Sequence, residues 1–238
     1  MAGHSKWANI KHKKDRVDKQ KGKVFSRIAK EIISAVKVGG PDPKANPRLR
    51  LALQKAKGAN VPNDVVDRNI KKASDPNTED FSEVTYEIYG HGGVGIIVEA
   101  MTDNKNRTAS DMRIATNKRG GTIGQPGSVT YNFDRKGVIQ VPKDGLKEDE
   151  VFQAALDAGA EDFEVVDEGF MITTSPTELY AVKDVLDEKN ISSSEAEIEW
   201  IPNTLIAVDS EMQKANEALV EWLEDLDDVD NVYHNMDL

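Results

Sequence analysis

Residues 83–101 read EVTYEIYGHGGVGIIVEAM, and this stretch decides the fold class. Val84, Tyr86 and Ile88 alternate with polar residues, which is the two-residue period of a strand with one buried face. The apolar run from Gly95 to Met101 predicts a second strand, and the glycines between the two runs predict a hairpin turn. A β-sheet is therefore expected near the middle of the chain.

The same glycines also match the spacing of a dinucleotide-binding loop. Gly90, Gly92 and Gly95 form the pattern G-x-G-x-x-G, which binds phosphate only where a strand precedes it and a helix N-terminus follows it. The apolar run after these glycines predicts a strand and not a helix. A hairpin turn is therefore favoured over nucleotide binding.

Three helices are predicted on the N-terminal side of this sheet. From Lys23 to Val38, apolar residues recur every three or four positions and basic residues fall between them, which is typical of an amphipathic helix. Residues 45–57 and 62–73 predict two more helices, joined by a short glycine-containing connection of the helix-turn-helix kind. Asp64 and Asp67 stand where such a motif would approach phosphate. Plain packing in a bundle is therefore favoured over base reading by this pair.

On the C-terminal side, the pattern alternates between helix and strand. Residues 104–119 predict a helix, and residues 128–133 a return to strand. Strands over 137–141, 163–166, 170–174 and 195–201, with helices over 148–158 and 177–189, give the order β-α-β-β-α-β of a ferredoxin-like unit. A helix over 210–226 and a strand over 229–233 follow, and this pair is too small to fold alone.

These elements predict an α+β protein of three domains. The first is a basic helical bundle over residues 1–78, which binds nucleic acid. The second is a middle α+β domain over residues 79–134, completed by the C-terminal helix and strand of residues 201–238. The third is an inserted ferredoxin-like α+β domain over residues 135–200.

Charge is divided unequally along the chain. Residues 1–73 hold nineteen Lys or Arg against six Asp or Glu, a net charge of +13. Residues 74–238 hold twelve against thirty-six, a net charge of −24, and the sum is the −11 of the whole chain. A local basic excess of this size predicts a polyanion-binding region despite the acidic total.

The basic excess is concentrated in the first thirty residues. Most of these cations are lysines, which suit phosphate, whereas reading of guanine edges favours arginine; contact with the nucleic-acid backbone is therefore expected more than base reading. Trp7 either stacks on an unpaired base or packs on the bundle, and a solvated tail is the alternative interpretation of the whole segment. The predicted nucleic-acid-binding residues are Lys6, Trp7, Lys11, His12, Lys13, Lys14, Arg16, Lys19, Lys21, Lys23, Arg27, Lys30, Arg48 and Arg50.

A second polar segment, Thr102 to Thr108, joins a predicted strand to a predicted helix. It combines residues that cap helices with two cations. Two interpretations are open: a helix N-cap, or a second polar contact surface made by Asn104, Lys105 and Arg107.

Other chemistries lack their usual residue patterns. The chain has no Cys, and its four His share no metal-binding spacing, so we expect no metal and no cofactor. No nucleophile elbow or other local catalytic signature occurs, so we expect no enzyme and no small-molecule substrate. The acidic run Glu224 to Asp230 lacks the glycine and the terminal glutamate of a calcium loop, and a solvated acidic face is predicted there.

Membrane and secretory signals are also missing. No apolar run reaches the ~18 residues of a membrane span, and the N-terminus lacks the apolar stretch of a secretory signal. We expect a cytoplasmic protein without a membrane partner.

Several stretches together resemble the YebC/PmpR family. The opening residues MAGHSKWANI, with Lys21-Gly22-Lys23, carry most of the resemblance, which spans nearly the whole chain. Further matching stretches are residues 39–43, 46–50, 86–90, 102–108, 127–129, 158–162, 201–204 and 232–235. The resemblance implies a helical N-terminal domain, two α+β domains around a cleft, and no enzyme activity.

The resemblance also implies a partner. Members of this family are described as transcriptional regulators that bind promoter DNA, and others, including mitochondrial relatives, as translational activators that act at the ribosome on proline-rich nascent chains. Promoter DNA is the first expectation and ribosomal RNA the alternative, with a protein partner for the acidic domains. Because the family motif opens the chain, we expect no organelle transit peptide and a bacterial cytoplasmic location.

Overall fold

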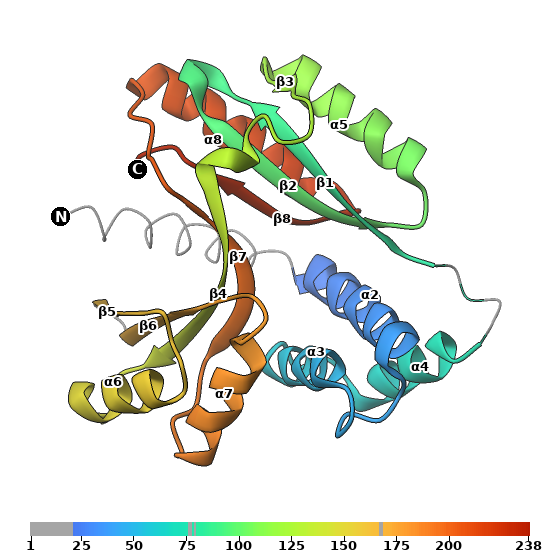
Figure 1. Ribbon diagram of the computed structural model, residues 1–238. Coiled ribbons are helices and arrows are strands. Elements are labelled where there is room, and N and C mark those ends of the chain that lie inside the picture. The colour runs from blue at the N-terminus through green and yellow to red at the C-terminus, as the bar shows by residue number, and fades with distance from the viewer. Residues whose placement is uncertain (1–20, 76–77, 79, 167–168) are drawn as a thin grey trace. The chain divides into compact units, whose positions relative to one another are not determined.

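The structure is a computed structural model, and it describes residues 21–75, 78, 80–166 and 169–238 (Figure 1). Helices and two antiparallel four-stranded sheets make up these residues, so the predicted α+β class is confirmed. The chain divides into two compact units, one of Met1–Asn132 with Thr204–Leu238 and one of Phe133–Asn203. The finer division into three domains stays a prediction. None of the described helices is long and apolar enough to cross a membrane.

The described part of the first unit begins with the predicted helices α2 (Lys21–Gly39), α3 (Pro47–Gly58) and α4 (Asn63–Ala73). The apolar stripe of α2 packs on α3 and α4, where Ile32 and Leu49 are almost fully buried. Asn46 joins two of these helices: its side chain accepts from Leu49 N at 3.0 Å, as an N-cap, and donates to Ala35 O at 2.8 Å. This side chain thereby connects the start of α3 to α2.

The first sheet has the strand order β3-β1-β2-β8, formed by β1 (Ser82–Tyr89), β2 (Gly95–Thr102), β3 (Thr122–Ile123) and β8 (Val229–His234). Tyr89 pairs with Gly95 across the predicted hairpin, and Gly92 takes a φ of +69°, which glycine adopts without strain. Because a strand follows these glycines, they make no helix N-terminus for phosphate. The helices α5 (Lys105–Arg119) and α8 (Ser210–Asp225) contribute Met112, Leu219 and Leu223 to the core of this sheet.

The second unit contains the predicted β-α-β-β-α-β series. Its elements are β4 (Phe133–Pro142), α6 (Glu148–Asp157), β5 (Asp162–Val166), β6 (Gly169–Thr174), α7 (Leu179–Glu188) and β7 (Glu195–Pro202). The strand order is β5-β6-β4-β7, so β6 lies between β4 and β5, antiparallel to both. Gly137 on β4 allows α7 to pack closely, because a Cβ at this position would lie 2.9 Å from Leu179 Cβ.

One predicted strand is wrong. Of residues 128–133 only Phe133 is in a strand, as the first residue of β4, and residues 130–132 form the short helix η2 (Thr130–Asn132). The cause is Glu87 on β1, whose carboxylate accepts hydrogen bonds from Gly127 N at 2.6 Å, Val129 N at 2.6 Å and Thr130 N at 2.8 Å. These N–H groups bind a side chain and not a neighbouring strand.

We expect Glu87→Gln to lower the free energy of unfolding at pH 7 by about 1–3 kcal/mol, because a buried charged acceptor of three N–H groups is lost. Burial alone would raise the pKa of Glu87, but these N–H groups and the Thr130 hydroxyl outweigh it, and the pKa lies below its usual value. The stabilisation is therefore complete above the usual pKa and is lost as the pH falls through the lowered one. Urea unfolding of both proteins from pH 7 to pH 3 measures this.

The matched control is Glu83→Gln on the same strand, because Glu83 is exposed and its ion pair with Arg48 lies at the surface. This control is expected to change stability by less than about 1 kcal/mol. Equal losses in the two variants, or a loss for Glu87→Gln that does not depend on pH, would contradict the assigned role of the Glu87 carboxylate.

Candidate nucleic-acid interface

The structure describes the side chains of five of the predicted nucleic-acid-binding residues. Lys23, Arg27 and Lys30 lie on α2, and Arg48 and Arg50 lie on α3. Lys21 begins α2, with its side chain outside the described part. The remaining predicted residues lie outside the described residues altogether: Lys6, Trp7, Lys11, His12, Lys13, Lys14, Arg16 and Lys19.

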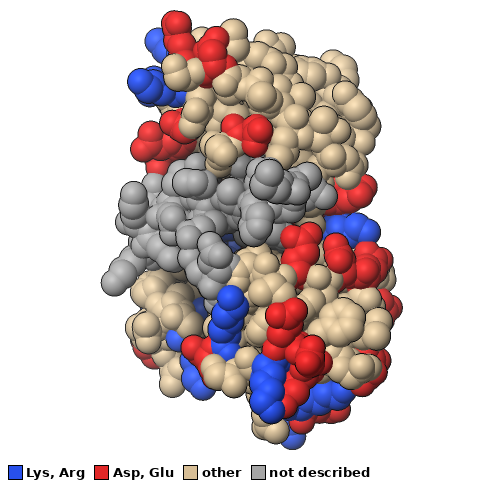
Figure 2. Space-filling model, turned by 90° about the vertical axis from the view of Figure 1, so that its left-hand side faces the viewer, with Lys and Arg blue, Asp and Glu red and all other residues tan. Residues whose placement is uncertain are grey.

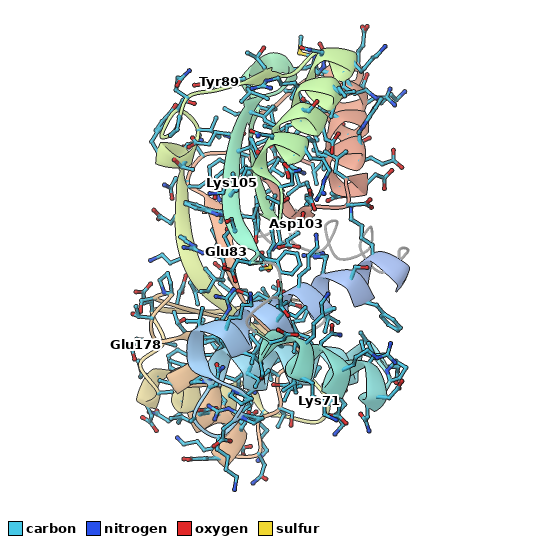
Figure 3. The ribbon with its side chains drawn as sticks, turned by 90° about the vertical axis from the view of Figure 1, so that its right-hand side faces the viewer. Lys71, Glu83, Tyr89, Asp103, Lys105 and Glu178 are labelled. Carbon is cyan, nitrogen blue, oxygen red and sulfur yellow. The ribbon has the colours of Figure 1, made fainter. Side chains whose placement is uncertain are left out.

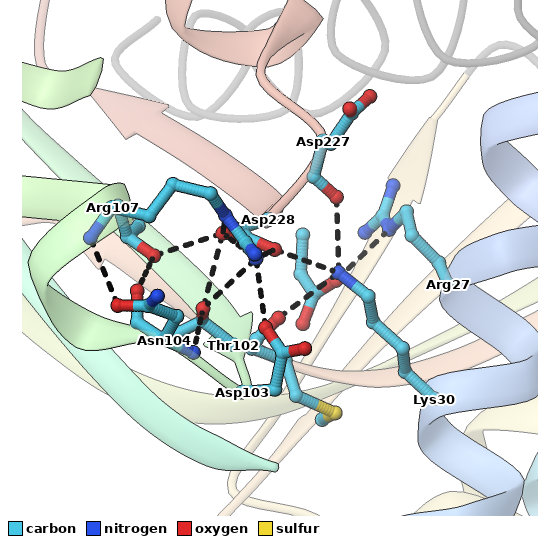
Figure 4. A network of polar contacts seen from close by, with 11 residues as sticks. Arg27, Lys30, Thr102, Asp103, Asn104, Arg107, Asp227 and Asp228 are labelled. Atoms are coloured by element: carbon cyan, nitrogen blue, oxygen red, sulfur yellow. Dashed lines mark hydrogen bonds and ion pairs between the residues drawn. The ribbon is translucent and has the colours of Figure 1, made fainter. Parts of the chain in front are cut away.

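Three cations of α2, Lys23, Arg27 and Lys30, contact the acidic segment, which we define as Glu224–Asn231. Lys30 Nζ donates to the backbone O of Asp227 at 3.0 Å and lies 3.3 Å from Asp228 Oδ1 (Figure 4). Arg27 Nη2 donates to Asn231 Oδ1 at 2.7 Å, and Lys23 Nζ donates to the backbone O of Glu224. Positions 23, 27 and 30 share one helix face. This face of α2 is engaged within the protein.

Asp228 is the centre of this network. Its side chain is buried and accepts hydrogen bonds from Thr102 Oγ1 at 3.0 Å, Thr108 Oγ1 at 2.9 Å and Arg107 Nη2 at 2.8 Å (Figure 4). Burial acts to raise the pKa of Asp228, but these donors and the Lys30 charge outweigh it, so the pKa lies below its usual value. Asp228 is therefore a buried, ionised and fully partnered carboxylate.

The prediction of a solvated acidic face over Glu224 to Asp230 is thus wrong for Asp228, and also for Asp230. Asp230 Oδ1 is buried without a hydrogen bond, and its nearest cationic atom in the described ion pairs is Arg27 Nε, 3.7 Å away. Burial raises the pKa of Asp230 to about 7. Burial also lowers the pKa of Lys23 to about 8. The contact between α2 and the acidic segment thus holds two groups that titrate near neutral pH.

The segment Thr102 to Thr108 forms the predicted N-cap. Asn104 Oδ1 accepts from Arg107 N at 3.1 Å at the start of α5. Arg107 also pairs with Asp103 at 2.8 Å, so its guanidinium is held between two carboxylates. Asp103 and Lys105 lie where β2 passes into α5 (Figure 3), and Asn104 and Lys105 are exposed. The second polar contact surface made by Asn104, Lys105 and Arg107 stays a prediction.

On the face that Figure 2 shows, the described cations do not form one continuous basic patch. Arg48 pairs with Glu83 at 2.5 Å, and Arg50 is exposed on α3. On the face that Figure 2 shows, the described Lys and Arg stand among Asp and Glu. Within the described residues no cluster of His, Asp and Glu is arranged to hold a metal ion.

Sequence reasoning missed the Asp228 network. Its members come from α2, β2, α5 and the turn before β8, which are far apart in the chain. An acidic run is usually solvated. The capping pattern around Asn104 was the one local signal, and it gave no indication of a carboxylate from the C-terminal region.

We expect Asp230→Asn to stabilise the protein increasingly as the pH rises from about 4 to 7. In this range the unfolded Asp230 ionises near its usual pKa of 3.8 while the folded one stays protonated to about 7. The wild-type free energy of unfolding therefore falls by up to about 1.4 kcal/mol per pH unit from this group. Urea unfolding at several pH values measures the difference, which levels off above pH 7.

The exposed neighbour Asp227 gives the control, since Asp227→Asn makes the same substitution at a side chain that is not buried. A difference between Asp230→Asn and wild type that is constant from pH 4 to 8 would mean that Asp230 ionises normally in the folded protein.

Two family models match successive parts of the chain. A family model described as the TACO1/YebC protein N-terminal domain matches residues 5–76. A second model, described as the TACO1/YebC second and third domain, matches residues 81–236.

Relatives match over almost the full chain. A probable transcriptional regulatory protein of Protochlamydia amoebophila is 64% identical, covering 99% of this chain and 96% of the relative. One of Chlamydia muridarum with the same description is 57% identical, covering 99% and 100%. The crystal structure of a conserved hypothetical protein from Aquifex aeolicus superposes with a TM-score of 0.83 at 43% identity, covering 92% of this chain and 91% of that chain. The chain therefore belongs to the TACO1/YebC family, as its motifs predict.

Proposed function

We propose that this protein is a nucleic-acid-binding regulator of gene expression without enzymatic activity, and that it acts in the cytoplasm as a DNA-binding transcriptional regulator. The observation that carries the proposal is the charge of the N-terminal segment. Residues 1–20 hold six Lys or Arg against two Asp, ahead of a chain whose net charge is −11. The two relatives named above are described as probable transcriptional regulatory proteins.

The contacts of α2 separate the basic residues that stabilise the fold from those that are available to bind phosphate. Lys23, Arg27 and Lys30 are engaged with the acidic segment, so phosphate would have to displace these contacts to reach them. Lys6, Lys11, Lys13, Lys14, Arg16 and Lys19 precede α2 directly in the chain. We assign the phosphate contacts to this preceding segment. The role of α2 is then to anchor the C-terminal end of the segment to the rest of the protein.

The acidic remainder of the chain has a complementary role. A net charge of −24 over residues 74–238 repels a polyanion, which limits binding to the basic end and opposes coating of DNA by many copies. The acidic surface is also suited to a protein partner with a basic face.

A ribosome-associated role, with ribosomal RNA along the same basic segment and assistance to the synthesis of proline-rich sequences, is the alternative. Lysine contacts to phosphate carry little sequence information in either nucleic acid. The identity of the bound nucleic acid in cells separates the two functions.

We expect Lys11→Glu, Lys13→Glu and Lys14→Glu together to weaken binding to all duplex sequences alike and to flatten its salt dependence. The logarithm of affinity falls by about 0.9 per neutralised phosphate for each tenfold rise in salt, so the slope should decrease by about 3 if each Lys neutralises one phosphate. Fluorescence anisotropy with a labelled duplex from 50 to 300 mM salt measures both quantities.

The matched control reverses three exposed lysines of the bundle, Lys57, Lys71 and Lys72 (Lys71 in Figure 3), and so changes the net charge equally. An equal loss in the two triple variants would assign binding to overall charge and not to the segment. In growing cells, crosslinking and denaturing purification should recover promoter fragments that the Lys11, Lys13 and Lys14 variant loses. Recovery of one region of ribosomal RNA, with DNA at background, would establish the alternative instead.

A further inference from the structure

The strand β1 has an outer edge that the sheet leaves largely open. β3 pairs with β1 only at Ile88 and Tyr89. Gly124 N donates to Glu87 O at 2.7 Å on this edge. Backbone groups along an antiparallel strand point alternately to the two sides, so those of Glu83 and Thr85 point away from β2 as well. In the part of the chain that the structure describes, these four N–H and C=O groups have no hydrogen-bond partner.

A groove lies beside this edge, between α5 and the strands β1 and β3. Its volume is about 330 Å³, and Tyr86 and Ile123 provide apolar lining. Arg113 and Asn117 on α5 line it as well. Both of these residues are exposed, and neither side chain has a hydrogen-bond or ion-pair partner among the described residues. Figure 3 shows β1 with α5 beside it. The groove thus combines apolar side chains with two hydrogen-bond donors, Arg113 and Asn117, that are available to a ligand.

The charge of α5 differs from that of its surroundings. This helix holds five of the twelve Lys and Arg of residues 74–238 against a single acidic residue, Asp111. Arg107 is bound to Asp228, and the Arg119 guanidinium lies over the ring of Trp222. Arg113 is the one charged residue among those that line the groove in the described structure. A carboxylate is the complement of an unpaired guanidinium.

We propose that the groove between β1 and α5 binds an extended peptide segment of a protein partner, which adds to the edge of β1 as a further strand and places a carboxylate side chain against Arg113. Unpaired backbone groups two residues apart are what strand addition requires, and the alternate side chains of the added strand enter the adjoining groove. A nucleic acid would offer phosphate to Arg113 but no N–H and C=O ladder to β1. The proposal goes beyond nucleic-acid binding, because it assigns the protein a peptide ligand.

The first measurement uses the full chain labelled with ¹⁵N and a capped peptide, Ser-Gly-Thr-Val-Glu-Val-Thr-Gly-Ser. The same peptide with lysine in place of glutamate is the comparison. We expect the glutamate peptide to bind about tenfold more tightly, as one charge-assisted contact predicts. Amide exchange at Thr85 and Glu83 should slow on binding, whereas Val84 already faces β2.

Variants of Thr85 test strand addition itself. Thr85→Pro removes an N–H that points away from β2, so β1 keeps its pairing with β2. We expect this variant to lose peptide affinity by about tenfold, while Thr85→Val, which keeps the N–H, stays close to wild type. Circular dichroism and thermal unfolding verify that both variants are folded.

Variants of α5 test the carboxylate. Arg113→Glu should reverse the preference of the protein between the two peptides, so that the lysine peptide binds better than the glutamate peptide. Lys118→Glu makes the same charge change at an exposed position of α5 outside the groove, and it should keep the wild-type preference.

Three results would overturn the proposal. One is that neither peptide binds, or that both bind equally to wild type. Another is that Thr85→Val loses as much affinity as Thr85→Pro. The third is that a single-stranded oligonucleotide, and no peptide, shifts the Arg113 and Asn117 signals, which would make this surface a nucleic-acid contact.

Discussion

The first unit depends on the hydrogen bonds and ion pairs that the buried Asp228 carboxylate makes. An ionised carboxylate away from water costs several kcal/mol unless it is paired and hydrogen-bonded, and Asp228 receives donors from β2, from α5 and from α2. Each of these elements must therefore lie within hydrogen-bond reach of one residue in the turn just before β8. A helix of the basic bundle, a central strand, a covering helix and the C-terminal strand are thereby joined at one point.

This constraint changes how the charges of the chain are understood. Lys23, Arg27 and Lys30 belong to the most basic part of the sequence, yet their side chains contact the acidic segment. These three cations of α2 thus stabilise the fold, and we assign the proposed contact with nucleic acid to the residues before this helix. On the other side of the same network, Arg107 is committed to Asp228 while Arg113, six residues later on α5, is not. On α5, the Asp228 network thus engages Arg107 and leaves Arg113 available for a partner.

Local patterns predicted the elements well where the cause was local. The alternation around Tyr86 and the glycines from Gly90 to Gly95 gave the hairpin, because strand period and turn residues act within a few positions. The apolar residues that recur every three or four positions predicted the buried face of α2 for the same reason. Residues 128–133 were misassigned because the carboxylate of Glu87, some forty positions earlier, binds their N–H groups. The acidic run was misassigned because its partners come from α2 and α5.

The sequence by itself therefore determined the α+β class, the order of helices and strands outside residues 122–133, the basic N-terminal segment and the family. Period, capping and net charge are properties of neighbouring residues, so they can be recognised without coordinates. Only the tertiary structure decided which charged groups are buried, which are paired and which strand edge is open. Burial and pairing depend on residues brought together from distant parts of the chain, and the same Asp is a solvated charge in one setting and the centre of a network in another.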